Sequence, residues 1–305
     1  MKINRLKLFR NIAALIILMS ATSAYELSKN SQSISSTSKK TNTSETKLEK
    51  TESTKQPSVF SGMASISRST SLYDLKDGSK YDGMDYLVGF GLNFNFGSFS
   101  SKLSYSQDLN DKTGENSSIN DTNITYSYLP ISISKNDRGV NLGWVPSVTM
   151  IIPLSDRSRN VEQLQTALIA SAGLSLSAGK NTAMSGLGSK FSISLGQNFH
   201  QFETDKNGTI SNKMSSNQSI ALYYTLSDFT FSLAYANMYR WPYSGNVKNS
   251  FSLSQDITYS FLDQYSVSIG QSNSGSTLKP NGYDSNISLF SDTNSILYLA
   301  FGASF

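Results

Sequence analysis

Apolar and polar residues alternate with a period of two along most of the chain from about residue 59 to Phe305. In MDYLVGFGLNFNF, residues 84–96, every even position from Tyr86 to Phe96 is apolar or aromatic, whereas the odd positions include Asp85, two glycines and two asparagines. Successive side chains of a strand point to opposite faces, so this pattern predicts a strand with one apolar face and one small, polar face. A chain made of such strands must place the two faces in different surroundings.

The alternation recurs in twelve segments of strand length, which predicts an all-β protein. We place these strands at residues 59–73, 84–96, 98–107, 122–133, 141–154, 167–178, 189–203, 214–226, 229–241, 249–261, 265–273 and 295–305. A helical pattern occurs only briefly, in VEQLQ (161–165). The joins G, SD and LDQ are very short, whereas DLNDKTGENSSIND and SGSTLKPNGYDSN are long and hydrophilic, so short and long connections mostly alternate.

The surroundings that suit such strands are hydrocarbon on one face and water on the other. A tilted strand of about ten residues crosses the apolar band, roughly 25 Å tall, of a barrel in an outer membrane. Unpaired backbone groups there cost several kcal/mol each, so a sheet spans the bilayer only by closing on itself. The other face is too rich in Ser, Gly and Asn for the dry core of a sandwich. The sequence therefore predicts a membrane-spanning antiparallel up-and-down β-barrel of 12 strands over residues 58–305.

A few polar residues fall on the face expected to contact lipid. Gln197, Gln255 and Gln271 occupy such positions, and Arg68 is in register with apolar residues of the first strand. A register error, a bulge or a position near the interface would each explain the glutamines. Aromatic residues gather near strand ends, as in the girdles of membrane barrels: Phe96, Phe99, Phe229, Phe261, Tyr265 and Phe305 at one rim, and Tyr73, Tyr105, Tyr239 and Trp241 at the other.

The amino-terminal residues precede the barrel. Residues 1–24 contain four basic residues, the apolar run IAALIILM and a small-residue site at Ala24, which predicts a cleaved signal peptide. Residues 25–57 are dominated by Ser, Thr, Lys and Glu, which predicts a disordered tail. Without residues 1–24 the chain has 22 basic and 22 acidic residues, so its charge gives no reason to expect a nucleic-acid partner. With no cysteine and one histidine, neither a disulfide framework nor a zinc site is expected.

Taken together, the export signal, the alternating strands and the final LYLAFGASF resemble the Gram-negative outer-membrane β-barrel class. Leu297, Leu299, Phe301 and Phe305 match the terminal signal that the barrel assembly machinery reads in this class, although Ala303 stands where an aromatic residue is usual. The resemblance covers about 248 residues and assigns no subfamily. It implies a place in the bacterial outer membrane, with lipid, lipopolysaccharide and the assembly machinery as partners.

A barrel of 12 strands is intermediate between filled and channel-forming barrels, so the size of the inner side chains decides whether it is open. Here they are mostly Ser, Gly, Ala and Asn, which leave room for water. The sequence predicts a porin-like passive diffusion channel for small hydrophilic solutes, with no cofactor. A sparse, mixed set of charges predicts weak charge selectivity, and the candidate pore-lining residues are Asp85, Lys102, Lys190, His200, Arg240 and Asp256.

Two other functions stay open from the sequence. The barrel could be a structural or adhesive anchor for its loops or tail. It could also be a lipid hydrolase, because barrels of similar size include such enzymes, but Phe202 rather than a serine follows His200 on the same face. Residues 108–115 partly resemble a calcium-binding loop, yet Lys112 and the late Gly114 break its spacing, so no metal site is expected.

Overall fold

The computed structural model describes residues 59–71, 82–110, 117–135, 141–178, 185–262, 264–291 and 294–305. The expected signal peptide (1–24) and tail (25–57) lie outside the described residues. The strands are β1 (Phe60–Ser71), β2 (Asp82–Phe94), β3 (Gly97–Asp108), β4 (Ser118–Ile119), β5 (Thr122–Tyr128), β6 (Ile131–Lys135), β7 (Asn141–Ile152), β8 (Leu164–Ser177), β9 (Leu187–His200), β10 (Asn212–Leu226), β11 (Phe229–Pro242), β12 (Lys248–Phe261), β13 (Tyr265–Ser276) and β14 (Ser295–Ser304).

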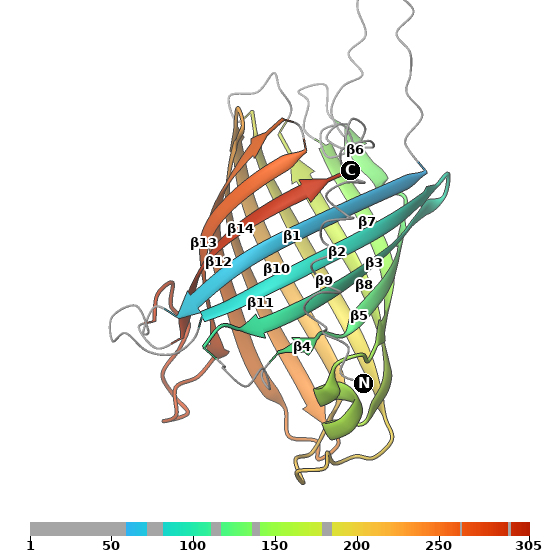
Figure 1. Ribbon diagram of the computed structural model, residues 1–305, viewed down its shortest axis with the longest axis vertical. Coiled ribbons are helices and arrows are strands. Elements are labelled where there is room, and N and C mark those ends of the chain that lie inside the picture. The colour runs from blue at the N-terminus through green and yellow to red at the C-terminus, as the bar shows by residue number, and fades with distance from the viewer. Residues whose placement is uncertain are drawn as a thin grey trace, which may run out of the picture.

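These strands form one closed antiparallel barrel with 12 positions around its wall (Figure 1). Closure comes from β1, which pairs with β2 on one side and with the last strand, β14, on the other. The short strands β4, β5 and β6 together occupy one wall position, because β4 and β5 pair with β3 while β5 and β6 pair with β7. The predicted fold class and strand number are confirmed, since the twelve predicted segments correspond to these twelve wall positions.

Proline explains why the wall position of β5 and β6 is interrupted. Pro130 lies between these two strands and has no N–H to donate to the ladder. On the neighbouring β7, Pro146 lies between Ser147, which pairs with β5, and Trp144, which pairs with β6. The missing donor of Pro146 therefore coincides with the break in its neighbour.

The two ends of the barrel differ in their connections (Figure 1). Short joins link β2 to β3, β10 to β11 and β12 to β13, and the carboxyl terminus lies at this end. The opposite end carries longer connections, among them residues 201–211 and a π-helical turn, η1 (Arg157–Val161). The brief helical pattern of 161–165 does not form a helix of its own, because the turn ends at Val161 and β8 begins at Leu164. Among the described residues, no helix has the length and apolar character needed to cross a membrane.

Cross-strand register divides the wall residues into two faces. Leu233, Ile257 and Ile269 share one face, and they are 40%, 43% and 62% exposed. Rings of the same face form two aromatic clusters at the short-turn rim: Phe94, Phe96, Phe99 and Tyr126, and Phe229, Tyr259, Phe261, Tyr265 and Phe301. Tyr239 stacks on Trp241 near the other rim. The outer face is therefore apolar, with aromatic rings toward its rims.

The carboxyl-terminal strand closes the barrel as its alternation predicts. Leu299 and Phe301 pair with Ile269 and Val267 of β13 on the outer face. Phe305 extends the pairing beyond β14, since its N–H donates to the Gly62 carbonyl at 2.9 Å and its carbonyl accepts from the Gly62 N–H at 2.7 Å. Its ring lies over Gly62, where any side chain would overlap it.

Polar residues on the outer face of β12 to β14 are covered by a segment of the last long connection. This outer strap, residues 285–291, lies over Gln271, Asn273 and Ser295, which are 5%, 1% and 0% exposed. Gln271 Nε2 donates to the Leu289 carbonyl at 2.7 Å, and Asn273 Nδ2 donates to the Ser288 carbonyl at 2.7 Å. The predicted outward position of Gln271 thus needs no register error.

The other outward polar residues singled out from the sequence are also accommodated. Gln255 Nε2 donates to Gln271 Oε1 at 2.7 Å, which extends the polar cluster beside the strap. Arg68 shares the face of Leu299, and its Nε donates to Asp82 at 2.8 Å where β2 begins. Gln197 lies three residues before the end of β9, near the rim. These four outward polar side chains, Arg68, Gln197, Gln255 and Gln271, are therefore paired, covered or close to an end of the barrel.

Candidate functional site: the barrel lumen

The inner face of the barrel is lined mainly by hydroxyl groups and glycines. Neighbouring strands bring hydroxyls into contact across the wall, as in the hydrogen bond of 2.6 Å between Ser192 and Ser219. Thr258 and Ser268 form a similar pair at 2.8 Å. A hydroxyl both donates and accepts, so each paired group can still bond to water in the lumen. The side chains that line this wall are mostly short and polar, which suits a water-filled passage.

Register places all six predicted pore-lining residues on the inner face. Asp85 pairs with Ser67 and Ser106, and Lys102 pairs with Gly89 and Asn123. The other four lie on three strands: the registers put Lys190 of β9, Arg240 of β11 and Asp256 of β12 on this face, and His200 follows Lys190 on it by the period of two along β9. The structure does not bring the six together, because they are spread around the barrel and along its axis. A role in lining a conducting pore stays a prediction for each of them.

Asp256 lies beside two hydroxyl groups of the wall. The Tyr298 hydroxyl of β14 reaches over Gly270 of β13 to the side of Asp256. Thr258 Oγ1 also lies within 3.4 Å of Asp256 Oδ1. Between the two strands, a side chain at Gly270 would meet the ring of Tyr298, so this glycine gives the ring its place. Asp256 therefore belongs to a structured patch of the inner wall.

A cavity of about 950 Å³ opens on the inner face near the end that carries the long connections. Its concave lining comes from four neighbouring strands, β10 to β13, which places it inside the barrel. Two cations, Arg240 and Lys248, belong to the lining, and none of the described residues that line it is acidic. Its principal polar residues are Asn217, Arg240, Lys248, Ser250, Ser252 and Ser274.

Several of these lining residues were missed by sequence reasoning because strand ends were placed too far inward. Strand β12 begins at Lys248, one residue before the predicted start, and β13 continues to Ser276, three residues beyond the predicted end. The signal was present in the period of two: counting back from Ser250 puts Lys248 on the inner face, and counting on from Ser272 does the same for Ser274.

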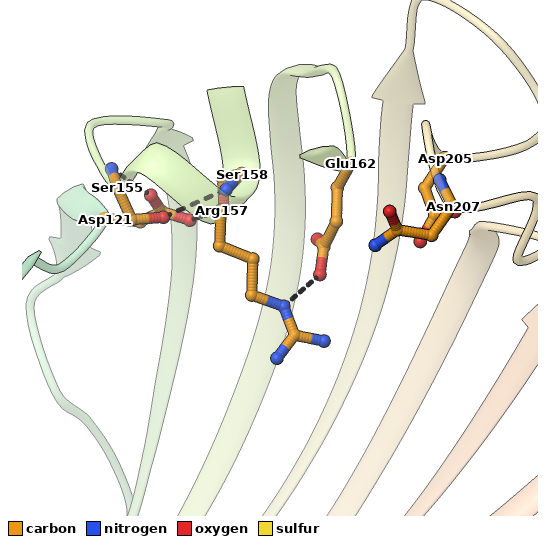
Figure 2. A network of polar contacts seen from close by, with 7 residues as sticks. All are labelled: Asp121, Ser155, Arg157, Ser158, Glu162, Asp205 and Asn207. Atoms are coloured by element: carbon orange, nitrogen blue, oxygen red, sulfur yellow. Dashed lines mark hydrogen bonds and ion pairs between the residues drawn. The ribbon is translucent and has the colours of Figure 1, made fainter. Parts of the chain in front are cut away.

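The long connections at this end are tied together by polar contacts (Figure 2). Asp121 accepts hydrogen bonds from the N–H groups of Leu154 and Ser155 at 3.0 and 2.9 Å, and from the Ser158 hydroxyl. Burial raises the pKa of Asp121, but these hydrogen bonds outweigh it and hold the pKa below the usual range of an aspartate. Asp121 therefore anchors the π-helical turn η1 as a carboxylate.

The turn η1 is joined in the same way to the connection that follows β9. Arg157 Nε donates to Glu162 at 2.8 Å across the turn (Figure 2). The N–H of Lys206 donates to the Val161 carbonyl at 3.1 Å, which links the turn to residues 201–211. Asp205 closes that second connection by accepting from the N–H of Thr209 at 2.7 Å. This part of the mouth is a hydrogen-bonded assembly.

His200 lies at the loop end of β9 beside Tyr243, with ring centroids 6.1 Å apart. Its Nδ1 is buried and has no hydrogen-bond partner among the described residues. No serine hydroxyl of the described chain is bonded to it, so the pair that a serine hydrolase needs is not formed there. Within the described residues no group of three or more His, Cys, Asp or Glu side chains could hold a metal ion.

Comparison with known proteins bears on the fold. No protein-family model and no curated protein matches the chain. The COG4313 outer membrane channel from Pseudomonas putida F1 aligns over 85% of this chain and 100% of its own, with 8% identity and a TM-score of 0.51. The NanC porin aligns over 80% of this chain and 98% of its own, with 12% identity and a TM-score of 0.49. At 8% identity the likeness to the COG4313 channel extends to the fold alone, and the chain is a closed 12-stranded antiparallel barrel of that fold.

Proposed function

We propose that this protein resides in the bacterial outer membrane and lets small hydrophilic solutes diffuse passively through its lumen. The observation that carries the proposal is the contrast between the two faces of one closed wall. The outer face exposes large apolar residues such as Ile269 and Leu299, which suit lipid. The inner face presents short hydroxyl-bearing side chains around a cavity, which suit water.

The proposed location implies particular partners. Lipid and lipopolysaccharide would surround the apolar face, and the barrel assembly machinery would insert the chain. Leu297, Leu299, Phe301 and Phe305 would form the signal that this machinery reads. Leu299 and Phe301 lie on the outer face, and Phe305 lies at the short-turn end, which supports this role.

Recording from planar bilayers tests the channel function. Purified mature protein is expected to insert and to produce discrete, stepwise increases in ionic current at constant voltage. The control is the same preparation after heat denaturation, which should give no steps. Folded, inserted protein that leaves the bilayer insulating would contradict the proposal and favour an anchoring role.

We also propose that the protein is not an enzyme, because the single histidine lacks a nucleophilic partner in the described structure. Incubated with phospholipid in detergent, the protein should release no fatty acid. Release that disappears in His200→Ala would overturn this part of the proposal and favour a hydrolase.

A further inference from the structure

The mouth of the lumen holds two cations in direct register. Arg240 near the end of β11 faces Lys248 at the start of β12 as its cross-strand partner. Like charges in this arrangement repel, so the pair destabilises the hairpin unless an anion lies nearby. Within the described chain neither residue forms an ion pair, and the hydrogen bond of Arg240 is a long one of 3.5 Å to Ser250.

The surroundings of the two cations provide hydrogen bonds and space. The cavity of about 950 Å³ that they line has the size of a small-ligand site. Hydroxyls of Ser250, Ser252 and Ser274 lie on its wall, and no acidic side chain does. The nearest acid along β12 is Asp256, eight residues or about 26 Å of strand away from Lys248.

We propose that this cavity is an anion-binding site at the mouth, which takes small hydroxylated carboxylates or phosphates. The inference rests on the proposed channel function and adds a solute class to it. A planar guanidinium can donate two parallel hydrogen bonds to a carboxylate or phosphate, and an ammonium adds a second positive charge. The serine hydroxyls would bond to the hydroxyls of the solute.

The placement of the site suits permeation. Cations that line a concave mouth raise the local concentration of anions and their rate of entry. The other lumen charges are of both signs and lie at other positions, so the bound solute meets no continuous track of cations. Binding that is local and weak lets the solute leave again, as conduction requires.

Two measurements test the site, one of which requires no conduction. In a salt gradient, the reversal potential should show that chloride is more permeant than potassium. Arg240→Gln and Lys248→Gln should each lower the chloride-to-potassium permeability ratio about twofold or more, because local counter-ion concentration follows the local potential. Lys206→Gln, which removes a cation from the same end but outside the cavity, is the matched control. Calorimetry in detergent should show binding of gluconate and weaker binding of uncharged sorbitol. In the double variant, which combines Arg240→Gln and Lys248→Gln, gluconate binding should be lost.

The outcomes separate the site from the channel. A conducting protein whose selectivity is the same in the wild type, the two variants and the control would overturn the anion site and leave the channel function intact. An insulating protein would overturn the channel function, and calorimetry would then decide the site alone. Phosphate in place of gluconate distinguishes the two anion classes. Equal binding of gluconate by the wild type and the double variant would overturn the proposal.

Discussion

Single side chains fit closely where the two ends of this barrel wall meet. The clearest case is Gly62, which leaves room for the ring of Phe305 where the first and last strands close. The terminal aromatic residue therefore has a structural role in the closed barrel in addition to any role in recognition during assembly.

Gly62→Ala is expected to destabilise the closed barrel, because its new methyl group would overlap the Phe305 ring. Overpacking of this kind costs about 1–3 kcal/mol. Urea unfolding measures the loss of stability, with the folded fraction read from the mobility of unheated samples on detergent gels. Gly173→Ala is the control, since a side chain there would meet its nearest atoms at 3.7–3.8 Å.

The double variant Gly62→Ala, Phe305→Ala should recover part of the loss caused by Gly62→Ala alone. Full additivity of the two changes would contradict the contact between this glycine and the terminal ring.

At the scale of elements, the outer strap explains how polar residues persist on an apolar wall. Its backbone carbonyls accept from Gln271 and Asn273, while Leu289 and Phe290 remain 50% and 59% exposed. The strap covers a polar patch and presents in its place an apolar surface that continues the outer face.

We expect the exposed side chains of the strap to contact lipid. In proteoliposomes, a tryptophan in Phe290→Trp should be quenched by brominated acyl chains and protected from aqueous iodide. Tyr283→Trp, at a position 90% exposed in the same connection, should show the reverse. If iodide quenches the tryptophans at positions 290 and 283 equally, the strap does not lie on the lipid-facing wall.

The anchoring of the turn η1 by Asp121 should depend on pH. A carboxylate whose pKa is lowered in the folded protein contributes stability above its unfolded pKa, near 3.9, and this contribution is lost as the pH falls through the folded pKa. The protection factors of the amides of residues 154–158 should therefore stay high at pH 5 and fall only under more acidic conditions.

Asp121→Asn should accelerate exchange of residues 154–158 already at neutral pH. Asp156→Asn is its control, because Asp156 is contacted only by Asn160, at 3.3 Å, among the side-chain hydrogen bonds of the turn. Protection factors that change neither with pH nor in Asp121→Asn would show that the turn is held by other contacts.

For the whole molecule, alternation was enough to predict the closed barrel because closure needs only strand number, period and two distinct faces. The strap could not be predicted, since SNISLFS has no strong strand period. Nothing in the sequence pattern links it to Gln271 and Asn273, which it contacts in the structure. The mouth cavity was missed for a different reason. Strand ends carry the weakest period, so the sequence pattern does not extend the strand to Lys248, although this residue lies on the inner face.

One face of the barrel wall should be wet and the other should contact lipid. Because the natural chain has no cysteine, single cysteines can be introduced without background. Proteoliposomes that carry Ser232→Cys, Ala234→Cys, Phe231→Cys or Leu233→Cys would be treated with a charged, water-soluble thiol reagent. Ser232→Cys and Ala234→Cys are expected to react, whereas Phe231→Cys and Leu233→Cys are not. Uniform reaction, or reaction at positions 231 and 233 alone, would contradict this expectation.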